Sequence, residues 1–373
     1  MLGNEWPLTR RRLLASARAI LLILAILGSG ALLLAPLVAS SSSEGEVEPS
    51  RIGPAPRDSS GRFLNWNDPL PRGGVGVRAS FFWSMLTGGA GGEITPPERL
   101  PNNGSFLRTN DRGTFATVTW IGHSSLLVQM GQQNFLTDPV WSKRASPVGW
   151  AGPERVIEPG LAIEDLPPIN FVLISHNHYD HLDLETLKQL AERFPGVQFW
   201  VPVGNAELLI ENGIEAVFEL DWGGSARSGE LEIVCLPAQH WSQRTPTDRR
   251  KALWSSWAVR SAERSFYFGG DTGYFSAFEA IGKEYGPFDL AALPIGAYEP
   301  SAMMQPVHLN PEEAVRAARD LRARQMMGIH FGTFVLTEEP FSEPPVRFRS
   351  ALEEAGLSAG FGWLLAIGET RAF

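Results

Sequence analysis

The sequence predicts a layered α/β domain, and three observations support this prediction. From residue 114 onward, short apolar segments alternate with turns, as strands do. Segments with helical spacing, such as 182–194 and 310–323, stand between them. The chain of 373 residues is 43% hydrophobic and 20% charged, which is typical of a globular protein with a sizeable core. Strands interspersed with helices indicate sheets covered by helices.

The first 39 residues are predicted to be a signal anchor or an export signal. Four arginines within positions 10–18 precede a nearly unbroken apolar run at 19–39. A bilayer core of about 30 Å needs about 20 apolar helical residues, which this run supplies. The arginines favour placing the rest of the chain on the extracytoplasmic, periplasmic side of a bacterial-type inner membrane. Because 9–14 resembles a twin-arginine signal, an uncleaved anchor and a cleaved, exported form both stay open.

Two further segments precede the catalytic domain, which we place at 114–373. Residues 40–60 are polar and contain proline, which predicts a flexible linker. Residues 61–113 are predicted to be an N-terminal extension packed on the domain. The extension contains an apolar patch that we interpret as packing on the domain, the alternative being contact with lipid or an acyl chain. The patch consists of Phe81, Phe82, Trp83, Met85 and Leu86.

Net charge and cysteine content exclude two classes of protein. The formal charge of −9 argues against nucleic-acid binding, which needs a cationic surface. The single cysteine, Cys235, excludes an internal disulfide framework. Its place in the alternating stretch LEIVCLP predicts a buried, inert thiol.

Within the domain, each predicted element has a local signal. The segment 171–175 is continuously apolar, which indicates a buried strand, and the helix predicted at 182–194 ends before Pro195-Gly196. The helix at 310–323 has Asn310 as its cap and Pro311 in its first turn. A third, shorter helix is predicted at 205–214. The remaining predicted strand segments are 115–130, 134–140, 197–203, 231–244, 253–261, 264–274, 289–298 and 325–334.

Residues that bind metals follow the ends of several apolar strands. Three of the seven histidines, together with one aspartate, form the motif HxHxDH directly after the strand at 171–175. Further ligand-type residues follow three later strands. Neutral imidazole and carboxylate oxygen are ligands that Zn²⁺ favours. The candidate ligands are His176, His178, Asp180, His181, His240, Asp271 and His330.

The spacing of these ligands predicts a site for two metals. His176 and His178, two residues apart in a tight loop, can face one ion, while Asp180 and His181 turn toward a second. Asp271 is a candidate bridge, since two-metal hydrolytic sites place their ions about 3.5–4 Å apart. An HxHxDH motif with three further ligands at strand ends is a much more specific signal than a lone HxH pair.

The same residues resemble a known family. The order of the HxHxDH motif followed by His240, Asp271 and His330 is similar to that of the metallo-β-lactamase-fold hydrolases. Within that superfamily, the stretches HNHYDHLD, PIGAYEP and HLNPEEAV are more specific and resemble the N-acyl phosphatidylethanolamine-hydrolysing phospholipases D. The resemblance extends from about Gly61 to the C-terminus. The resemblance implies a four-layered αββα sandwich and a homodimer. Gln243 stands where the animal enzymes have a basic residue, so acyl-chain preference is left open.

The resemblance also implies roles for individual residues. His176, His178, His240 and Asp271 would bind a first zinc ion, and Asp180, His181, Asp271 and His330 a second, with iron as an alternative metal. Tyr179 and His308 would contact the phospholipid head. His308 also precedes the helix capped by Asn310, whose free N–H groups favour an anion. His123 belongs to a family motif and is interpreted as a structural group that supports the ligands.

The expected function is zinc-dependent phosphodiester hydrolysis at a membrane. A hydroxide shared by the two metals would attack phosphorus, with Asp180 and Asp271 as catalytic residues and Asp180 passing a proton to the leaving alkoxide. N-acyl phosphatidylethanolamine would yield N-acylethanolamine and phosphatidic acid. A metallo-hydrolase acting on another ester or a lactone is the alternative, because this fold supports many reactions. A membrane-tethered binding protein without catalysis is a third interpretation.

Overall fold

The computed structural model describes residues 52–70, 73–87, 91–110, 115–358 and 360–373. The predicted signal anchor or export signal lies outside these ranges, as does most of the predicted linker. Across the described ranges, no helix combines the length and the apolar character that crossing a membrane requires.

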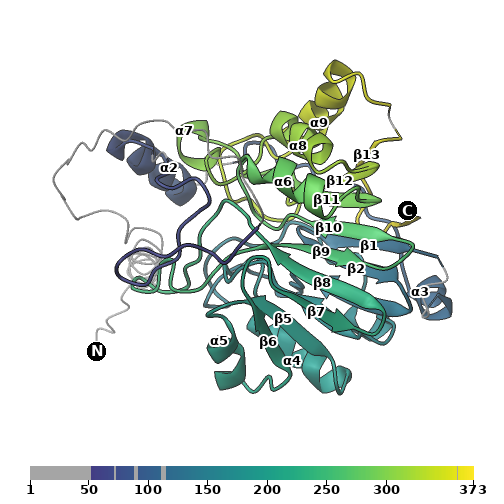
Figure 1. The fold of residues 1–373 in the computed structure, drawn as a ribbon. Helices are drawn as coiled ribbons and strands as arrows, with labels where there is room; N and C mark the ends of the chain where they lie inside the picture. The colour runs from purple at the N-terminus through teal and green to yellow at the C-terminus, as the bar shows by residue number, and fades with distance from the viewer. Residues whose placement is uncertain (1–51, 71–72, 88–90, 111–114, 359) are drawn as a thin grey trace, which may run out of the picture.

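Two sheets of seven strands each form the centre of the molecule (Figure 1). The strand order is β14-β1-β2-β3-β4-β5-β6 in the first sheet and β13-β12-β11-β10-β9-β8-β7 in the second. The first sheet contains β1 Thr117–Gly122, β2 Ser125–Met130, β3 Gln133–Thr137, β4 Phe171–Leu173, β5 Gln198–Pro202, β6 Val217–Leu220 and β14 Thr370–Ala372. The second contains β7 Ser225–Ser228, β8 Leu231–Leu236, β9 Ser256–Arg260, β10 Ser265–Phe268, β11 Leu290–Pro294, β12 Gln325–Ile329 and β13 Gly362–Trp363.

Helices flank the two sheets on their outer sides. Helix α8 packs on β11 and β12 and also contacts α6 and α9, whereas α5 packs beside β6. Helix α4 buries its leucines on the outer face of the first sheet. The predicted mixed α/β sandwich is therefore confirmed. The helices are α2 Val75–Thr87, α3 Ser105–Thr109, α4 Leu184–Arg193, α5 Ala206–Glu211, α6 Ala277–Glu284, α7 Ser301–Met304, α8 Pro311–Asp320 and α9 Glu343–Glu354, with a 3₁₀ turn at Ile163–Asp165.

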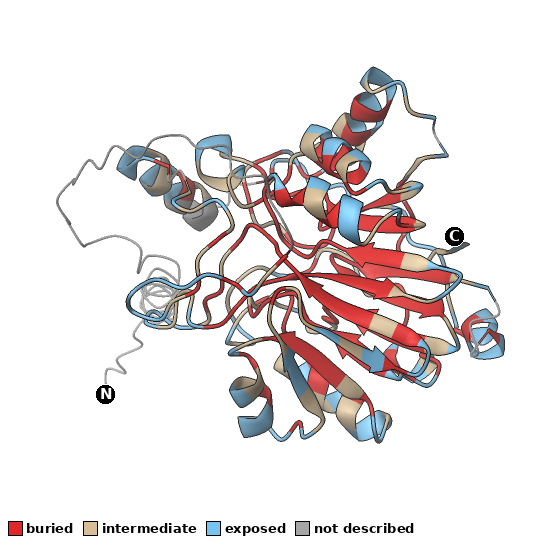
Figure 2. Cartoon of the chain, viewed as in Figure 1, coloured by how far each residue is buried: buried red, intermediate tan, exposed pale blue. Residues whose placement is uncertain are grey.

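Strand β4 shows how the apolar sequence builds two cores. Its side chains alternate between faces, so Phe171 and Leu173 enter the core shared by the two sheets, while Val172 and Ile174 enter the core under α4. A strand that is covered on both faces has a continuously apolar sequence. Figure 2 shows the result, with buried strands at the centre and exposure on the outer sides of the helices. Cys235 is fully buried in the shared core, as predicted.

Several predicted strands and helices were longer than the observed ones, and some elements were not predicted. The strand predicted at 231–244 ends at Leu236 in the structure, because Pro237 has no N–H for the ladder and the chain then leaves the sheet. Helix α8 has the predicted Asn310 cap, completed by Glu313 into a capping box. Helices α2, α6 and α9 were not predicted, since each has a short or weakly periodic apolar face.

The N-terminal extension contributes α2, which packs against α7 (Figure 1). Phe81 of α2 is buried, whereas Val75 and Trp83 are 75% and 67% exposed. The side chains of Phe82, Met85 and Leu86 lie outside the described part of the chain. The predicted apolar patch is thus divided in the structure, with one described member packed inward and one facing outward.

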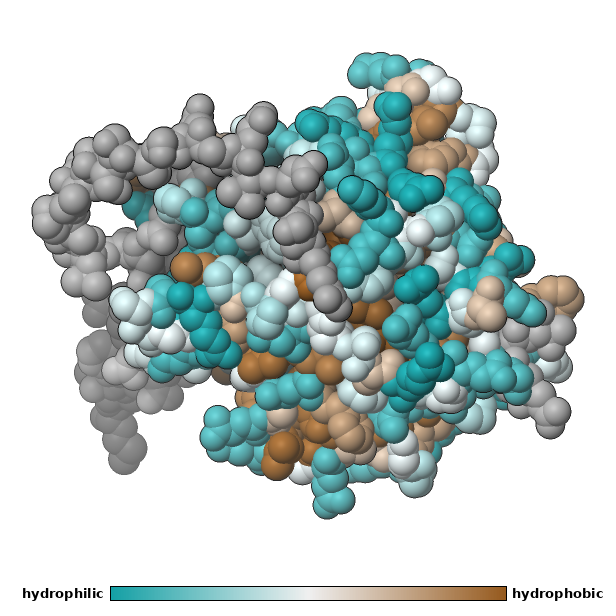
Figure 3. All heavy atoms as spheres, viewed as in Figure 1, coloured by the Kyte–Doolittle hydropathy of each residue, from teal (hydrophilic) through white to brown (hydrophobic). Residues whose placement is uncertain are grey.

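Most of the visible surface is polar, and apolar side chains gather on part of it (Figure 3). Ile210 of α5 is 56% exposed and Phe218 of β6 is 41% exposed. Phe218 stacks on Trp200 of the neighbouring strand, with ring centroids 4.7 Å apart. These residues place apolar surface at the β6 edge of the first sheet.

Candidate metal centre

All seven histidines of the chain lie at one site, together with Asp138, Asp180 and Asp271. These residues form several overlapping sets, and within each set the ligand atoms lie within 4.8 Å of one another. The convergence follows from the topology, because β3 and β4 run parallel in one sheet, as do β10, β11 and β12 in the other. The site residues follow the strands in the order His123 after β1, Asp138 after β3, His176 after β4, His240 after β8, Asp271 after β10 and His330 after β12.

A first group consists of three imidazoles and one carboxylate. Nδ1 of His178 lies 2.8 Å from Nε2 of His176 and 3.2 Å from Nε2 of His240. Oδ2 of Asp271 lies 3.9 Å from Nε2 of His176 and 3.8 Å from Nε2 of His240. The structure therefore brings together the four residues expected to bind the first ion.

A second group lies on the other side of the Asp271 carboxylate. Nε2 of His181 lies 3.2 Å from Oδ2 of Asp271 and 3.4 Å from Oδ2 of Asp180. Nε2 of His330 lies 3.1 Å from Oδ1 of Asp271 and 3.5 Å from Oδ2 of Asp180. These are the four residues expected to bind the second ion.

The spacing within both groups suits a small divalent cation. A tetrahedral ion with ligand bonds of about 2.1 Å places its ligand atoms about 3.4 Å apart. The distances from 2.8 to 3.9 Å in the two groups bracket this value. Asp271 is the one ligand common to both groups, so its carboxylate has the position of a bridge.

Hydrogen bonds behind the ligands orient two of the imidazoles. Nδ1 of His181 lies 2.7 Å from Oδ2 of Asp138, so His181 donates to this carboxylate and presents Nε2 to the site. Ser175 Oγ donates to Asp138 at 2.6 Å and lies 2.9 Å from Nδ1 of His176, which likewise leaves Nε2 facing inward. Our sequence analysis did not identify Asp138, although it stands at a strand end like the other site residues.

The charges of the metal-free site are uneven between the two groups. Burial lowers the pKa of His178 to about 3 and holds the pKa of His176 and His240 well below the usual range, so all three are neutral. Burial also disfavours charge on His181 and His330. At these two imidazoles the Asp271 and Asp180 carboxylates outweigh the effect of burial. They raise the pKa of His330 to about 9 and that of His181 well above its usual range.

Several buried ligand atoms lack a partner among the described residues, and this is the observation that fits a metal. Nε2 of His181, Nε2 of His330 and Oδ1 of Asp271 are buried without a hydrogen bond of good geometry. Such atoms are costly to bury unless an ion satisfies them. Neutral imidazoles and carboxylates are also the donor set that Zn²⁺ accepts. The residues present fit two divalent cations.

Three of the seven described non-glycine residues with positive φ lie at this site. His123, Asp138 and His330 adopt left-handed backbone conformations, with φ of 54°, 34° and 60°. Each such conformation costs a non-glycine residue about 1–3 kcal/mol, which the surrounding structure has to offset. All three residues immediately follow a strand, so the sharp turn directs their side chains into the site.

Comparison with known proteins identifies the family. Residues 133–331 match the family described as the beta-lactamase superfamily domain. The chain is 44% identical over 255 residues to N-acyl-phosphatidylethanolamine-hydrolyzing phospholipase D 1 of Caenorhabditis elegans, covering 65% of this chain and 71% of the nematode protein. The chain is a metal-dependent hydrolase of the metallo-β-lactamase superfamily and belongs to its family of N-acyl-phosphatidylethanolamine-hydrolysing phospholipase D-like proteins.

Two further comparisons extend this assignment. The mitochondrial N-acyl-phosphatidylethanolamine-hydrolyzing phospholipase D of Saccharomyces cerevisiae is 35% identical over 246 residues, covering 64% of this chain and 52% of the yeast protein, so the match spans about half of that relative. Among solved structures, the metallo-hydrolase Igni18 of the archaeon Ignicoccus hospitalis superposes with a TM-score of 0.53. The two are 25% identical, and the superposition covers 70% of this chain and 99% of that one.

Tyr179, for which the family resemblance predicts contact with the phospholipid head, has its hydroxyl engaged elsewhere. The hydroxyl donates to the carbonyl oxygen of Arg244 at 3.0 Å, and the Arg244 guanidinium lies 3.9 Å from the centre of the Tyr179 ring. Arg244 also donates to the carbonyls of Asn177 and Leu182, each at 2.9 Å. Tyr179 and Arg244 therefore brace the loop that carries the HxHxDH motif.

His308 lies at the site, and the start of the helix that follows it is partly occupied. Asn310 accepts the N–H of Glu313, and Glu312 and Glu313 place negative charge in the first turn of α8. Glu312 pairs with Arg347, and the anion contact expected at this helix end stays a prediction. His308 itself lies with Nδ1 3.9 Å from Oδ2 of Asp271, and this nitrogen has no described hydrogen-bond partner.

His123 lies beside Asp180, a proposed metal ligand, and is itself among the residues that could hold an ion there, so its expected supporting role stays a prediction. Its Nε2 atom is 3.1 Å from Oδ2 of Asp180, and its ring centroid is 4.1 Å from that of His330. Burial, followed by the neighbouring His330, lowers its pKa to about 3. A neutral His123 donates one N–H to Asp180 and so restricts the orientation of that carboxylate.

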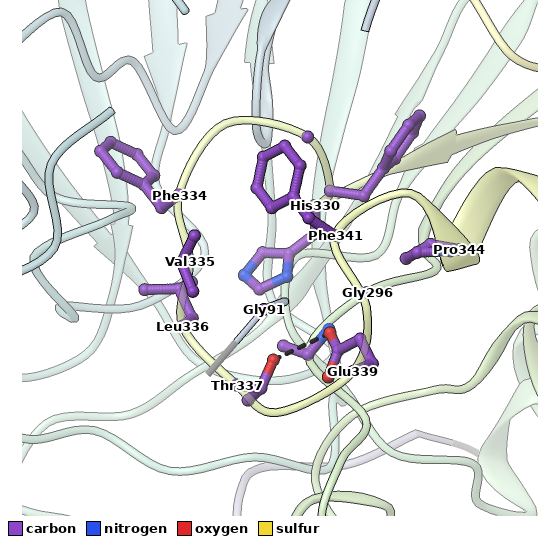
Figure 4. Close-up of a pocket in the computed structure, with 13 residues that line it drawn as sticks. Gly91, Gly296, His330, Phe334, Val335, Leu336, Thr337, Glu339, Phe341 and Pro344 are labelled. Carbon is purple, nitrogen blue, oxygen red and sulfur yellow. Dashed lines mark hydrogen bonds between the residues drawn. The ribbon is translucent and has the colours of Figure 1, made fainter. Parts of the chain in front are cut away.

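A small pocket opens beside His330 (Figure 4). Phe334, Val335 and Leu336 line it on one side, and its volume of about 20 Å³ is room for a single water molecule. At its far end Glu339 accepts hydrogen bonds from Thr337 at 2.8 Å and from two backbone N–H groups, which shapes the loop. A pocket of this size does not accommodate an acyl chain.

Proposed function

We propose that the chain is a zinc-dependent phosphodiesterase of the phospholipase D type, which hydrolyses N-acyl phosphatidylethanolamine to N-acylethanolamine and phosphatidic acid. The observation that carries this proposal is the pair of ligand groups that share Asp271. The identity of 44% to a nematode protein named for this reaction supports the substrate. Iron in place of zinc would use the same ligands.

The proposed metal ligands follow from the two groups. His176, His178 and His240 would hold one ion with Asp271, and Asp180, His181 and His330 would hold the other with the same Asp271. When bound, the ions would supply a nucleophile from water at neutral pH and neutralise charge on the phosphoryl oxygens.

Asp180 is the proposed group that passes a proton from the attacking water to the leaving alkoxide. Burial raises its pKa, but His181, His123 and His330 together lower it well below the usual range, so it is ionised and has no proton of its own to give before the reaction starts. His123 fixes one of its oxygens at 3.1 Å. The proton would reach the alkoxide of the ethanolamine product from this carboxylate.

His308 is the proposed contact for a phosphoryl oxygen. Burial lowers its pKa to about 4, so the ring is neutral and can donate one N–H. It is 9% exposed, which places it at the entrance of the site. Its backbone N–H donates to Met304 of α7 at 2.8 Å, so α7 and the α2 helix packed on it flank this entrance.

The membrane is part of the proposal, since the substrate resides there. Trp83 and Val75 on α2 expose apolar surface beside α7, where the acyl chains of a bilayer could be met. We include a membrane anchor or export signal at 1–39, an extracytoplasmic catalytic domain and a homodimer in the proposal.

Mass spectrometry of the products tests this function. Wild type and Asp271→Ala are incubated with N-acyl phosphatidylethanolamine vesicles and, separately, with a lactone at equal zinc. We expect N-acylethanolamine and phosphatidic acid from wild type, and turnover by Asp271→Ala reduced at least about 100-fold. Faster turnover of the lactone would replace the phospholipase proposal with its alternative. Equal turnover by both proteins would refute the shared-ligand mechanism.

A further inference from the structure

The segment 52–70, which we call the strap, spans the end of the predicted linker and the start of the N-terminal extension, and it contacts the loop that carries His240. Its Phe63 side chain is fully buried in the core between the sheets. The Phe63 N–H donates to the carbonyl of Arg250 at 2.9 Å, and the Ala55 N–H donates to Asp221 at 2.9 Å. The strap is therefore docked at several points, although it lies outside the residues 133–331 that match the superfamily.

The side chain of Asn65 in the strap both donates a hydrogen bond to the backbone of His240 and accepts one from it. Its side-chain nitrogen donates to the His240 carbonyl at 2.9 Å, and its side-chain oxygen accepts the His240 N–H at 2.9 Å. The same oxygen accepts the indole N–H of Trp254 at 2.9 Å. Asn65 is 2% exposed, so these bonds are shielded from water.

This contact matters because His240 lies beyond the end of its strand. Strand β8 ends at Leu236, so the backbone N–H and carbonyl of His240 have no ladder partner and need other ones. A side-chain amide offers one donor and one acceptor and can replace a neighbouring strand. The ring is fixed separately, since Nδ1 of His240 lies 2.9 Å from the carbonyl oxygen of Val307. Only Nε2 is left to bind a metal, and it faces the other residues of the first ligand group.

A salt bridge fixes the strap just beyond Asn65. Asp68 pairs with both terminal nitrogens of Arg250, at 3.1 and 3.2 Å, and accepts the backbone N–H of Asn65. Both side chains are mostly buried, at 14% and 13% exposure, where a bidentate pair is geometrically restrictive. Asn65 thus stands between two fixed points, Phe63 and Asp68.

We infer that Asn65 is a positioning residue for the metal centre: it orients His240 so that the first ligand group is complete only while the strap is docked. The inference rests on the two-metal site of the proposed function and not on the identity of the substrate. Groups behind a metal ligand typically affect metal affinity by about 10–100-fold. Loss of the Asn65 contact is expected to weaken metal affinity within the same range, for one of the two ions.

Chelator competition on the full chain, with zinc alone as the probe, tests the inference. Asn65→Asp keeps the volume and both accepted bonds but has no N–H to donate to the His240 carbonyl. We expect one zinc equivalent to bind about 10–100-fold more weakly and the other to be unchanged. Asn103→Asp, an exposed asparagine outside the site, is the matched control and should bind both equivalents like wild type. Unchanged affinity for both equivalents in Asn65→Asp would overturn the inference.

Thermal unfolding with and without zinc separates positioning from a purely structural role. A ligand that binds only the folded state stabilises it by RT ln(1 + L/Kd), where L is the free ligand concentration, so weaker binding reduces the gain in Tm on adding zinc. We expect a smaller gain for Asn65→Asp and for Asn65→Ala than for wild type. Equal losses of Tm in the metal-free and zinc-loaded proteins would show that Asn65 only stabilises the fold. Absence of zinc binding by wild type would instead refute the metal centre itself.

Discussion

Nδ1 of His181 lies 2.7 Å from Oδ2 of Asp138, and both side chains are fully buried. Burial raises the pKa of Asp138, while His181 and Ser175 act in the opposite direction. A carboxylate behind a ligating imidazole fixes the ring and increases its basicity. The second ligand group therefore depends on a residue at the end of β3 that would not itself bind the metal.

Asp138→Asn should weaken zinc binding at the second group by about 10–100-fold, because the neutral amide orients His181 less strongly. Chelator competition measures the affinity of each equivalent. Asp165→Asn, which changes a half-buried carboxylate paired with Arg108 outside the site, is the control and should bind zinc like wild type. Affinity equal to wild type in Asp138→Asn would contradict the role assigned to the Asp138–His181 pair.

Removing one ligand from either group should remove one metal equivalent. His178→Ala takes a ligand only from the first group and His330→Ala only from the second, so elemental analysis should find about one zinc per chain in each. His308→Ala is the control, since His308 is a buried histidine of the same site that is not among the proposed ligands. Two full equivalents in both ligand variants would contradict the assignment of the groups.

Metal binding at the second group should tighten as the pH rises from 6 to 9. In the metal-free protein the pKa of His330 is raised to about 9, so below that pH its proton has to leave before a metal can bind. The same proton stabilises the metal-free fold, an effect fully present below the unfolded pKa of about 6.5 and lost as pH rises through about 9. Calorimetry in buffers of different ionisation enthalpy measures the proton release. Affinity independent of pH over this range would show that the metal-free site is already deprotonated.

Arg244→Lys should loosen the loop of the HxHxDH motif. The guanidinium donates to two backbone carbonyls at 2.9 Å and stacks on Tyr179, and a lysine ammonium cannot do both. The expected loss is about 1–3 kcal/mol in the free energy of unfolding, measured by urea titration of the zinc-loaded protein. Arg264→Lys, at an exposed turn, should change it by less than about 0.5 kcal/mol. A loss no larger in Arg244→Lys than in this control would mean that the loop is braced by other contacts.

The fold and the ligand residues were predictable because both follow from local patterns. The continuous apolar run at 171–175 indicates a strand buried on both faces, and β4 is such a strand. Ligand-type residues after strands need only that those strands run in parallel, which the α/β pattern implies. The position of each ligand in the sequence was therefore enough to predict that the ligands meet.

The supporting residues were not predictable from local patterns. Asn65 contacts His240 across 175 positions of the chain, and nothing in the stretch RFLNWND indicates where its side chain lies. The start of α8 was predictable only in part. Its Asn310 cap was correctly identified, but the capping box with Glu313 was not, and the anion contact expected there stays a prediction.

Because every histidine of this protein belongs to the one site, imidazole groups can serve as a spectroscopic probe without background. Isotope labelling of histidine alone would give seven imidazole signals, each from a side chain in or beside the ligand groups. A zinc titration followed by NMR would then show the order in which the two groups fill. A reagent that modifies histidines would likewise act at this site alone, and bound metal should protect against it.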